Sequence, residues 1–125
     1  MTPHTILIVE DEPLIAMMLE DFLLSQGHEV RGPCESVAEG LAAVAADDFD
    51  LAILDVNLKG ESVWPVATAL RAKDIPFVLA SGGHVEAPPA EFANTPMIEK
   101  PYTIDRVLPV IRDALGGADN KEIIT

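Results

Sequence analysis

Apolar residues along the chain gather in five short runs, and the stretches between the runs show the longer spacing of amphipathic helices. The first of these stretches is the clearest, because Ile15, Met18, Leu19 and Phe22 recur at the three- and four-residue spacing of one helix face. Gly27 follows them as the usual left-handed stop of a helix. The pattern therefore predicts alternating strands and helices. The expected strands are residues 5–9, 29–31 (a weak run), 51–54, 77–80 and 97–98.

The later helices carry recognisable start signals. Ser36 with Glu39 forms a possible capping box before an alanine-rich stretch, and Pro65 suits the first turn of the next helix. Thr103 is the expected cap of a last helix. Residues 84–96 contain three prolines, so we expect at most a short and mobile helix there.

Strict alternation of helices with continuous apolar strands indicates a parallel sheet that is covered by helices on both faces. Five such units favour an α/β fold with a doubly wound five-stranded sheet in the flavodoxin-like order 2-1-3-4-5. A chain of 125 residues suits one core, so we expect a single domain over residues 1–117 and a flexible tail over residues 118–125. In this order the first and third strands are neighbours, and ligands bind beyond their carboxyl ends.

The net charge and the single cysteine limit the kinds of partner and the cellular compartment that we expect. Eight lysines and arginines against 21 acidic residues give a formal charge of −13, so a cation or a basic protein surface is expected and nucleic acid is not. The single Cys34 cannot form an internal disulfide, which suits a reducing compartment. The chain shows neither a signal-peptide pattern nor the ~18 apolar residues of a membrane span. We therefore expect a soluble cytoplasmic protein with no membrane partner.

Acidic residues follow two strands that should be neighbours in the sheet. Glu10, Asp11 and Glu12 come directly after the first strand, and Asp55 comes at the end of the third. Like charges ~4 Å apart repel by ~4 kcal/mol at an effective dielectric constant of ~20, so such a cluster requires a raised pKa or a bound cation. Carboxylate oxygens are the ligands that Mg²⁺ prefers. The sequence therefore predicts a Mg²⁺ site at Glu10, Asp11 and Asp55.

Two further residues stand at the ends of the last two strands. Ser81 offers a hydroxyl after the fourth strand, and Lys100 offers an ammonium after the fifth. A carboxylate nucleophile, a divalent ion, a lysine and a hydroxyl are what phosphoryl transfer to an aspartate requires. Each residue alone has a simpler interpretation as a helix cap, a turn residue or a surface charge. Their combination at four strand ends favours Asp55 as a phosphoacceptor.

The stretches ILIVEDEP, LAILDVNLKG, FVLASGG and IEKPY contain these residues, and with them the whole chain resembles a response-regulator receiver domain. The resemblance implies that the main-chain carbonyl of Asn57 also binds the metal. It assigns one role to each of the other residues: phosphoacceptor Asp55, metal-binding acids Glu10 and Asp11, switch hydroxyl Ser81 and invariant lysine Lys100.

A narrower likeness concerns IPFVLASGGH, DVNLKGESVWPVA and PMIEKPY, which are similar to the FAT-GUY group of stand-alone receivers. Leu79 and Ser81 stand where that group has Phe and Thr, and Met97 stands where many receivers have Tyr or Phe. The resemblance implies a module without an output domain, which catalyses its own phosphorylation and dephosphorylation but is no enzyme otherwise. It also implies a sensor histidine kinase or a histidine phosphotransfer protein as phosphodonor, and an unknown downstream protein as partner.

Three other functions remain as alternatives. A phosphorylation-independent pseudo-receiver would lack active-site residues, and here every position is filled. A phosphatase of the haloacid dehalogenase type commonly has a second acid two residues after its nucleophile, where this chain has Asn57. A flavodoxin that binds FMN needs a phosphate loop after the first strand, where Glu10, Asp11 and Glu12 would repel phosphate. A phosphoacceptor in two-component signal transduction is the leading hypothesis.

Overall fold

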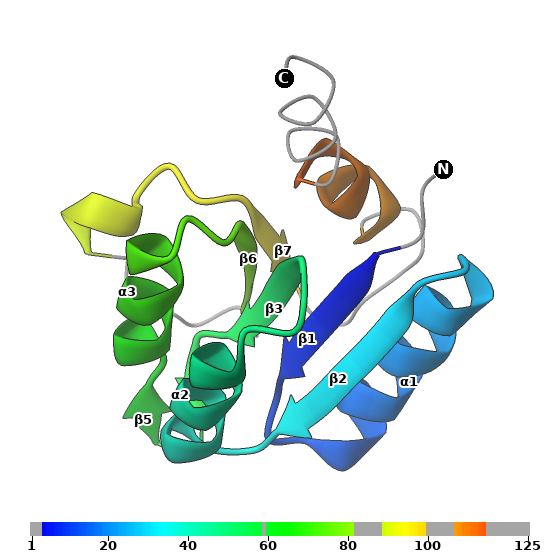
Figure 1. The fold of residues 1–125 in the computed structure, drawn as a ribbon, viewed down its shortest axis with the longest axis horizontal. Coiled ribbons are helices and arrows are strands. Elements are labelled where there is room, and N and C mark those ends of the chain that lie inside the picture. The colour runs from blue at the N-terminus through cyan, green and yellow to red at the C-terminus, as the bar shows by residue number, and fades with distance from the viewer. Residues whose placement is uncertain (1–3, 59, 82–88, 100–106, 115–125) are drawn as a thin grey trace.

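The computed structural model describes residues 4–58, 60–81, 89–99 and 107–114, and it shows one parallel sheet with helices on both sides (Figure 1). The strands of the sheet follow the order β2-β1-β3-β6-β7, which is the expected order 2-1-3-4-5 once a separate small hairpin, β4 and β5, is set aside. The strands are β1 Thr5–Val9, β2 Glu29–Cys34, β3 Leu51–Asp55, β4 Asn57–Leu58, β5 Glu61–Ser62, β6 Phe77–Ser81 and β7 Met97–Glu99.

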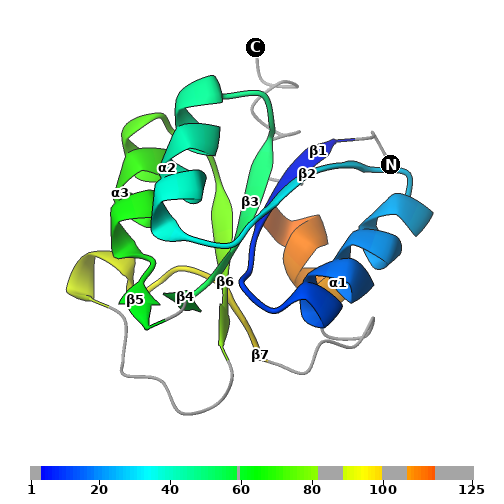
Figure 2. The same ribbon diagram turned by 90° about the horizontal axis from the view of Figure 1, so that it is seen from below.

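Helices α2 and α3 cover one face of the sheet, whereas α1 and the helical residues 107–114 cover the other (Figure 2). Successive strand residues point to opposite faces, so a central strand supplies both cores. Leu7 and Val9 of β1 belong to the core beneath α2 and α3, and Ile6 and Ile8 belong to the core beneath α1. The helices are α1 Pro13–Ser25, α2 Val37–Ala46, α3 Trp64–Ala72 and the single 3₁₀ turn η1 Ala90–Phe92.

The local signals in the sequence account for several helix boundaries. The backbone N–H of Glu39 donates to Oγ of Ser36 over 3.1 Å at the start of α2, as the capping box predicts. Pro65 lies in the first turn of α3, where its missing N–H breaks no helical hydrogen bond. Gly27 follows α1 with a φ of 88°. These three predictions are confirmed.

The prediction of which face α1 buries is wrong in one position. Met18 is 44% exposed, and the fully buried residues of the helix are Ala16, Leu19 and Leu23. The reason is that α1 is apolar around most of its circumference, so hydrophobic spacing alone does not show which side packs on the sheet. The helix therefore exposes apolar side chains to solvent on the side that faces away from the sheet.

Strand β2 is longer than expected, because it continues through a β-bulge. Its register against β1 changes from Leu7 opposite Arg31 to Val9 opposite Cys34, so β2 has one extra residue. Gly32 lies inside this bulge with a φ of 89°. Proline and glycine weaken a strand signal in the sequence, which explains why the expected strand ended at Arg31.

Two further expectations concern the second half of the chain. Within residues 89–96 the single turn η1 is the only helix, as the proline content predicts. Lys100, Thr103 and the tail at residues 118–125 lie outside the described residues. In the part of the chain that the structure describes, no helix is long and apolar enough to cross a membrane.

Candidate functional site

The sheet brings three acidic residues together at the carboxyl ends of two neighbouring strands. Asp55 is the last residue of β3 and Glu10 directly follows β1, whose Val9 pairs with Leu54. Carboxylate oxygens of Glu10, Asp11 and Asp55 all lie within 4.8 Å of one another. The strands of the first and third apolar runs are therefore neighbours, and the acids that follow them lie together.

The electrostatics of this cluster favour a bound cation. Glu10 is 2% exposed and Asp55 is 6% exposed, so little water can solvate these two carboxylates. Two carboxylate charges at this spacing repel by about 4 kcal/mol at an effective dielectric constant of about 20. Asp11 is partly exposed, so the cluster is open to solvent on its side. Oxygen ligands that leave one side open to water fit Mg²⁺, which keeps several of its waters in proteins.

Backbone hydrogen bonds hold the loops that carry the acids. The N–H of Glu10 donates to the carbonyl of Cys34 over 2.9 Å, directly after the bulge of β2. The N–H of Glu12 donates to Oε2 of Glu10 over 3.3 Å. Helix α1 begins directly after Glu12, so the partial positive charge of its amino terminus lies beside the acids. These contacts fix the position of Glu10 and offset part of the charge.

The remaining predicted site residues differ in how far the structure describes them. Ser81 is the last residue of β6, the strand next to β3, and its backbone pairs with Glu99 of β7. Asn57 lies in β4, two residues after Asp55. The structure thus places Ser81 at the same end of the sheet as the acids. Lys100, which follows β7 in the chain, lies outside the described residues.

Cys34 lies near this end of the sheet but has the character of a core residue. Its side chain is buried, and burial followed by the nearby charge of Glu39 raises the pKa of the thiol. The Sγ atom lies 3.6 Å from the carbonyl oxygen of Glu39, to which the thiol donates. A raised pKa disfavours the thiolate, which is the nucleophilic form. Cys34 is therefore not a candidate nucleophile.

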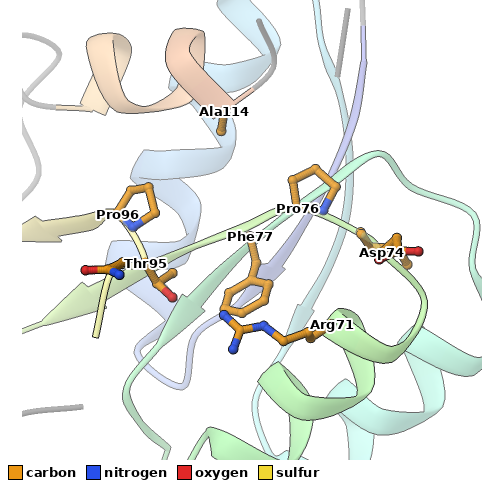
Figure 3. Close-up of a pocket in the computed structure, with 9 residues that line it drawn as sticks. Arg71, Asp74, Pro76, Phe77, Thr95, Pro96 and Ala114 are labelled. Atoms are coloured by element: carbon orange, nitrogen blue, oxygen red, sulfur yellow. The ribbon is translucent and has the colours of Figure 1, made fainter. Parts of the chain in front are cut away.

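The described residues also form a cleft of about 400 Å³, and none of Glu10, Asp11 and Asp55 lines it. It lies at the amino-terminal end of β6, where Arg71 lies against the ring of Phe77 (Figure 3). Pro96 and Ala114 line it from the start of β7 and from the last described helix. No motif in the sequence indicates this cleft, because its residues come from three separate segments.

A doubly wound parallel sheet with carboxylates gathered at its topological switch point defines a class of α/β proteins that bind ligands at this edge. The family described as "Response regulator receiver domain" matches residues 6–112. The chain belongs to this family.

The most informative structural relative is SdrG from Sphingomonas melonis Fr1, at 49% identity and a TM-score of 0.82, over 92% of this chain and 99% of that one. The BeF₃-activated conformation of SdrG from Pseudomonas melonis Fr1 is similar at 50% identity and a TM-score of 0.75, over 89% and 94%. The transcriptional regulatory protein TcrA of Mycobacterium tuberculosis strain H37Rv is 40% identical over 73 residues, 56% of this chain and 27% of its own length. The chain thus spans about a quarter of that curated relative.

Membership of this family gives the general function. Receiver domains of two-component response regulators are signalling modules that interact with histidine kinases and with downstream proteins. They generally bind Mg²⁺ at an acidic pocket, and Glu10, Asp11 and Asp55 form an acidic cluster of this kind.

Proposed function

We propose that this chain accepts a phosphoryl group on Asp55 from a sensor histidine kinase or a histidine phosphotransfer protein, and then signals through protein contacts. One observation carries the proposal: the buried Asp55 carboxylate ends β3 within 4.8 Å of carboxylate oxygens of Glu10 and Asp11. A lone carboxylate at a strand end would suit a helix cap. Three carboxylates that converge from two separate segments suit the binding of a cation beside a nucleophile.

The proposed reaction is a direct phosphoryl transfer. A carboxylate oxygen of Asp55 forms a bond to phosphorus while the bond between phosphorus and the donor imidazole nitrogen breaks. The imidazole keeps the electron pair of that bond and takes a proton from solvent. Ser81 would donate a hydrogen bond to one phosphoryl oxygen, and Lys100 would offset the charge of another. The low exposure of Asp55 would limit the access of water, and so slow the hydrolysis of the acyl phosphate.

The proposed metal ligands are carboxylate oxygens of Glu10, Asp11 and Asp55 and the main-chain carbonyl of Asn57. Bound Mg²⁺ would neutralise negative charge on the transferred group and on the acids around it. The four groups are all hard oxygen donors. The described residues of the cluster include no sulfur or imidazole ligand, which a softer metal would prefer. The donor set therefore fits Mg²⁺.

The outer face of α1 is the proposed docking surface for the phosphodonor. Four of the six large apolar side chains that are strongly exposed in the described residues lie on this helix. The first of them, Leu14, is close to the acids, because α1 starts directly after the acidic loop. A partner with an apolar surface and basic residues would complement this face and the charge of −13. The exposed residues are Leu14 (80%), Met17 (55%), Met18 (44%) and Leu24 (52%).

Incubation with Mg²⁺ and acetyl phosphate tests the proposed chemistry without a kinase. The protein should gain a single phosphate that is lost in alkali, which is the behaviour of an acyl phosphate. Intact-protein mass spectrometry before and after alkali treatment measures it. A protein that takes up no phosphate from acetyl phosphate, or one that keeps it in alkali, would contradict the proposal.

A separate comparison tests the docking surface. Leu14→Ser should slow phosphotransfer from any histidine kinase that phosphorylates the wild type, because a contact on the apolar face is lost. Leu41→Ser is the matched control, because Leu41 is exposed on α2 and not on α1. Both variants should react with acetyl phosphate as the wild type does. Equal kinase rates for the two variants would show that the donor docks elsewhere.

A further inference from the structure

Two side chains of helix α3 pack against the ring of Phe92. Trp64 stacks on this ring at a centroid distance of 5.4 Å and an interplanar angle of 12°, and the guanidinium carbon of Arg71 lies 4.5 Å from its centroid. Trp64 and Arg71 are seven residues apart, which places them on one face of α3 about 10 Å apart along the axis. That spacing accommodates one ring between them. We call the three side chains the Phe92 clamp.

The contacts of the clamp attach η1 to α3 in the part of the chain that the structure describes. Phe92 is 1% exposed, and Phe77 of β6 meets its ring edge-on at a centroid distance of 6.0 Å. Nη1 of Arg71 also donates to the carbonyl of Glu91. A single 3₁₀ turn has too few internal hydrogen bonds to hold its own position. The contacts with α3 and β6 therefore decide where η1 lies.

The position of η1 in the chain connects the clamp to the candidate site. Phe92 lies between Ser81, which ends β6, and Lys100, which follows β7. The carbonyl of Pro96 accepts from the N–H of Leu79 over 2.9 Å, so the segment after η1 is already aligned with β6. Loss of the clamp would remove the contacts between α3 and η1, which precedes β7 and Lys100 in the chain.

We propose that Arg71 is a positioning residue for phosphoryl transfer, because it completes the Phe92 clamp and thereby holds η1, which lies in the chain between Ser81 and Lys100. The inference rests on the proposed function of these two residues. Arg71 touches no acid of the cluster, and its own side chain is exposed beside the cleft (Figure 3). It can therefore be replaced without opening the core. The Mg²⁺ ligands lie on the segments after β1 and β3, which the clamp does not hold.

Binding of beryllofluoride, which mimics a phosphoryl group on aspartate, separates this role from a general structural one. Arg71→Gln removes the cation that lies over the ring of Phe92 and the charged donor that bonds to the carbonyl of Glu91. Because η1 is then held less firmly, the apparent beryllofluoride affinity should fall about three- to tenfold. The Mg²⁺ affinity should stay within twofold of the wild type. Arg71→Lys keeps a cation and a donor and should restore most of the loss. Fluorescence of Trp64, the single tryptophan, should change in Arg71→Gln before any ligand is added.

Arg112→Gln is the matched control, because Arg112 is also exposed and its replacement removes the same charge from the last described helix. It should bind Mg²⁺ and beryllofluoride as the wild type does. Equal beryllofluoride affinity in Arg71→Gln and Arg112→Gln would overturn the role of Arg71 but leave the proposed function intact. An equal loss of Mg²⁺ and beryllofluoride affinity in Arg71→Gln would also overturn it, because it would indicate general damage. If the wild type binds beryllofluoride no better than Asp55→Asn, the proposed function fails and the inference falls with it.

Discussion

Polar side chains at the amino-terminal end of the sheet bond to nearby backbone, whereas those at the carboxyl end converge on one another. The N–H of His4 donates to Nδ1 of His28 over 3.1 Å. Thr5 and Asp50 exchange two hydrogen bonds, from the N–H of Thr5 to Oδ2 of Asp50 over 2.9 Å and from the N–H of Asp50 to the carbonyl of Thr5 over 2.7 Å. At this end the side chains of His28 and Asp50 secure the start of β1.

The carboxyl end has a different arrangement, because its side chains carry the same charge. Glu10 and Asp11 come from the loop after β1 and Asp55 from the end of β3, and two of the three are almost fully buried. Burial of like charges costs stability, and folds keep such a cost where function requires it. A polar residue at a strand end therefore indicates little by itself. Several of one sign that meet from separate segments indicate a site.

The largest expected effect tests this contrast with the same substitution at both ends. Asp55→Asn should abolish labelling by acetyl phosphate, because an amide is too poor a nucleophile to attack phosphorus. Asp50→Asn should be labelled as the wild type is, because Asp50 only bonds to Thr5. Mass spectrometry measures both. Labelling that survives in Asp55→Asn would place the acceptor elsewhere, and its loss in Asp50→Asn would remove the contrast between the two ends.

A second comparison concerns two glycines that both have positive φ. A Cβ on Gly32 would lie 2.6 Å from the carbonyl oxygen of Ile8, so Gly32→Ala should lower the free energy of unfolding by about 2–4 kcal/mol. A Cβ on Gly27 would meet nothing within 4 Å, so Gly27→Ala should cost only about 1 kcal/mol.

Urea unfolding of the two glycine variants measures this difference. Because the Gly32 bulge precedes the hydrogen bond from Glu10 to Cys34, Gly32→Ala should also weaken Mg²⁺ binding, and Gly27→Ala should not. Equal losses of stability in the two variants would mean that the close approach at Gly32 relaxes without cost.

Metal binding should produce a smaller effect that is again confined to the carboxyl end. Mg²⁺ at ten to a hundred times its dissociation constant should stabilise the fold by about 1–3 kcal/mol, which raises the melting temperature by several degrees. Asp11→Asn should remove most of this response, and Asp50→Asn should retain it. Differential scanning calorimetry with and without Mg²⁺ provides the measurement. A wild-type melting curve that does not respond to Mg²⁺ would contradict the metal site.

Much of the fold and of the candidate site can be predicted because each depends on a local pattern. Continuous apolar runs locate the strands, and the strand order then brings Glu10 and Asp55 to the same edge. The buried face of helix α1 is a feature that such a local pattern does not predict. Its apolar residues surround the helix, so their spacing does not show that Met18 faces solvent.

Other features depend on contacts between distant segments and leave no signal in the sequence. The hairpin of β4 and β5 has strands of only two residues, too short for an alternating pattern. The clamp of Trp64 and Arg71 on Phe92 joins a helix to a single turn about 20 residues away in the chain. The contact of His4 with His28 depends on how β1 and β2 start beside each other. Residues of this kind become visible only when the elements are placed in space.

The smallest expected effect concerns the amino-terminal end and depends on pH. Burial, followed by the charges of His4 and of the chain's amino terminus, lowers the pKa of His28 below its ordinary value of 6.5. The neutral ring also accepts from the N–H of His4 at Nδ1, which protonation at that nitrogen would prevent. Between the lowered pKa and 6.5 the unfolded chain binds more protons than the folded one. Stability should therefore fall as the pH drops through 6.5 toward the lowered pKa, by at most about 1.4 kcal/mol per pH unit.

His28→Asn isolates this contribution, because its side-chain oxygen can accept from the N–H of His4 but does not titrate. Urea unfolding at pH 7.5, 6.5 and 5.5 should show a shallower loss of stability for the variant than for the wild type, whatever the constant difference between them. Phosphorylation by acetyl phosphate at pH 7.5 should be the same in both proteins, because His28 lies at the end of the sheet opposite Asp55. Parallel stability profiles would mean that His28 does not titrate in this range. A loss of phosphorylation in His28→Asn would show that the two ends of the sheet are coupled, against the contrast drawn between them.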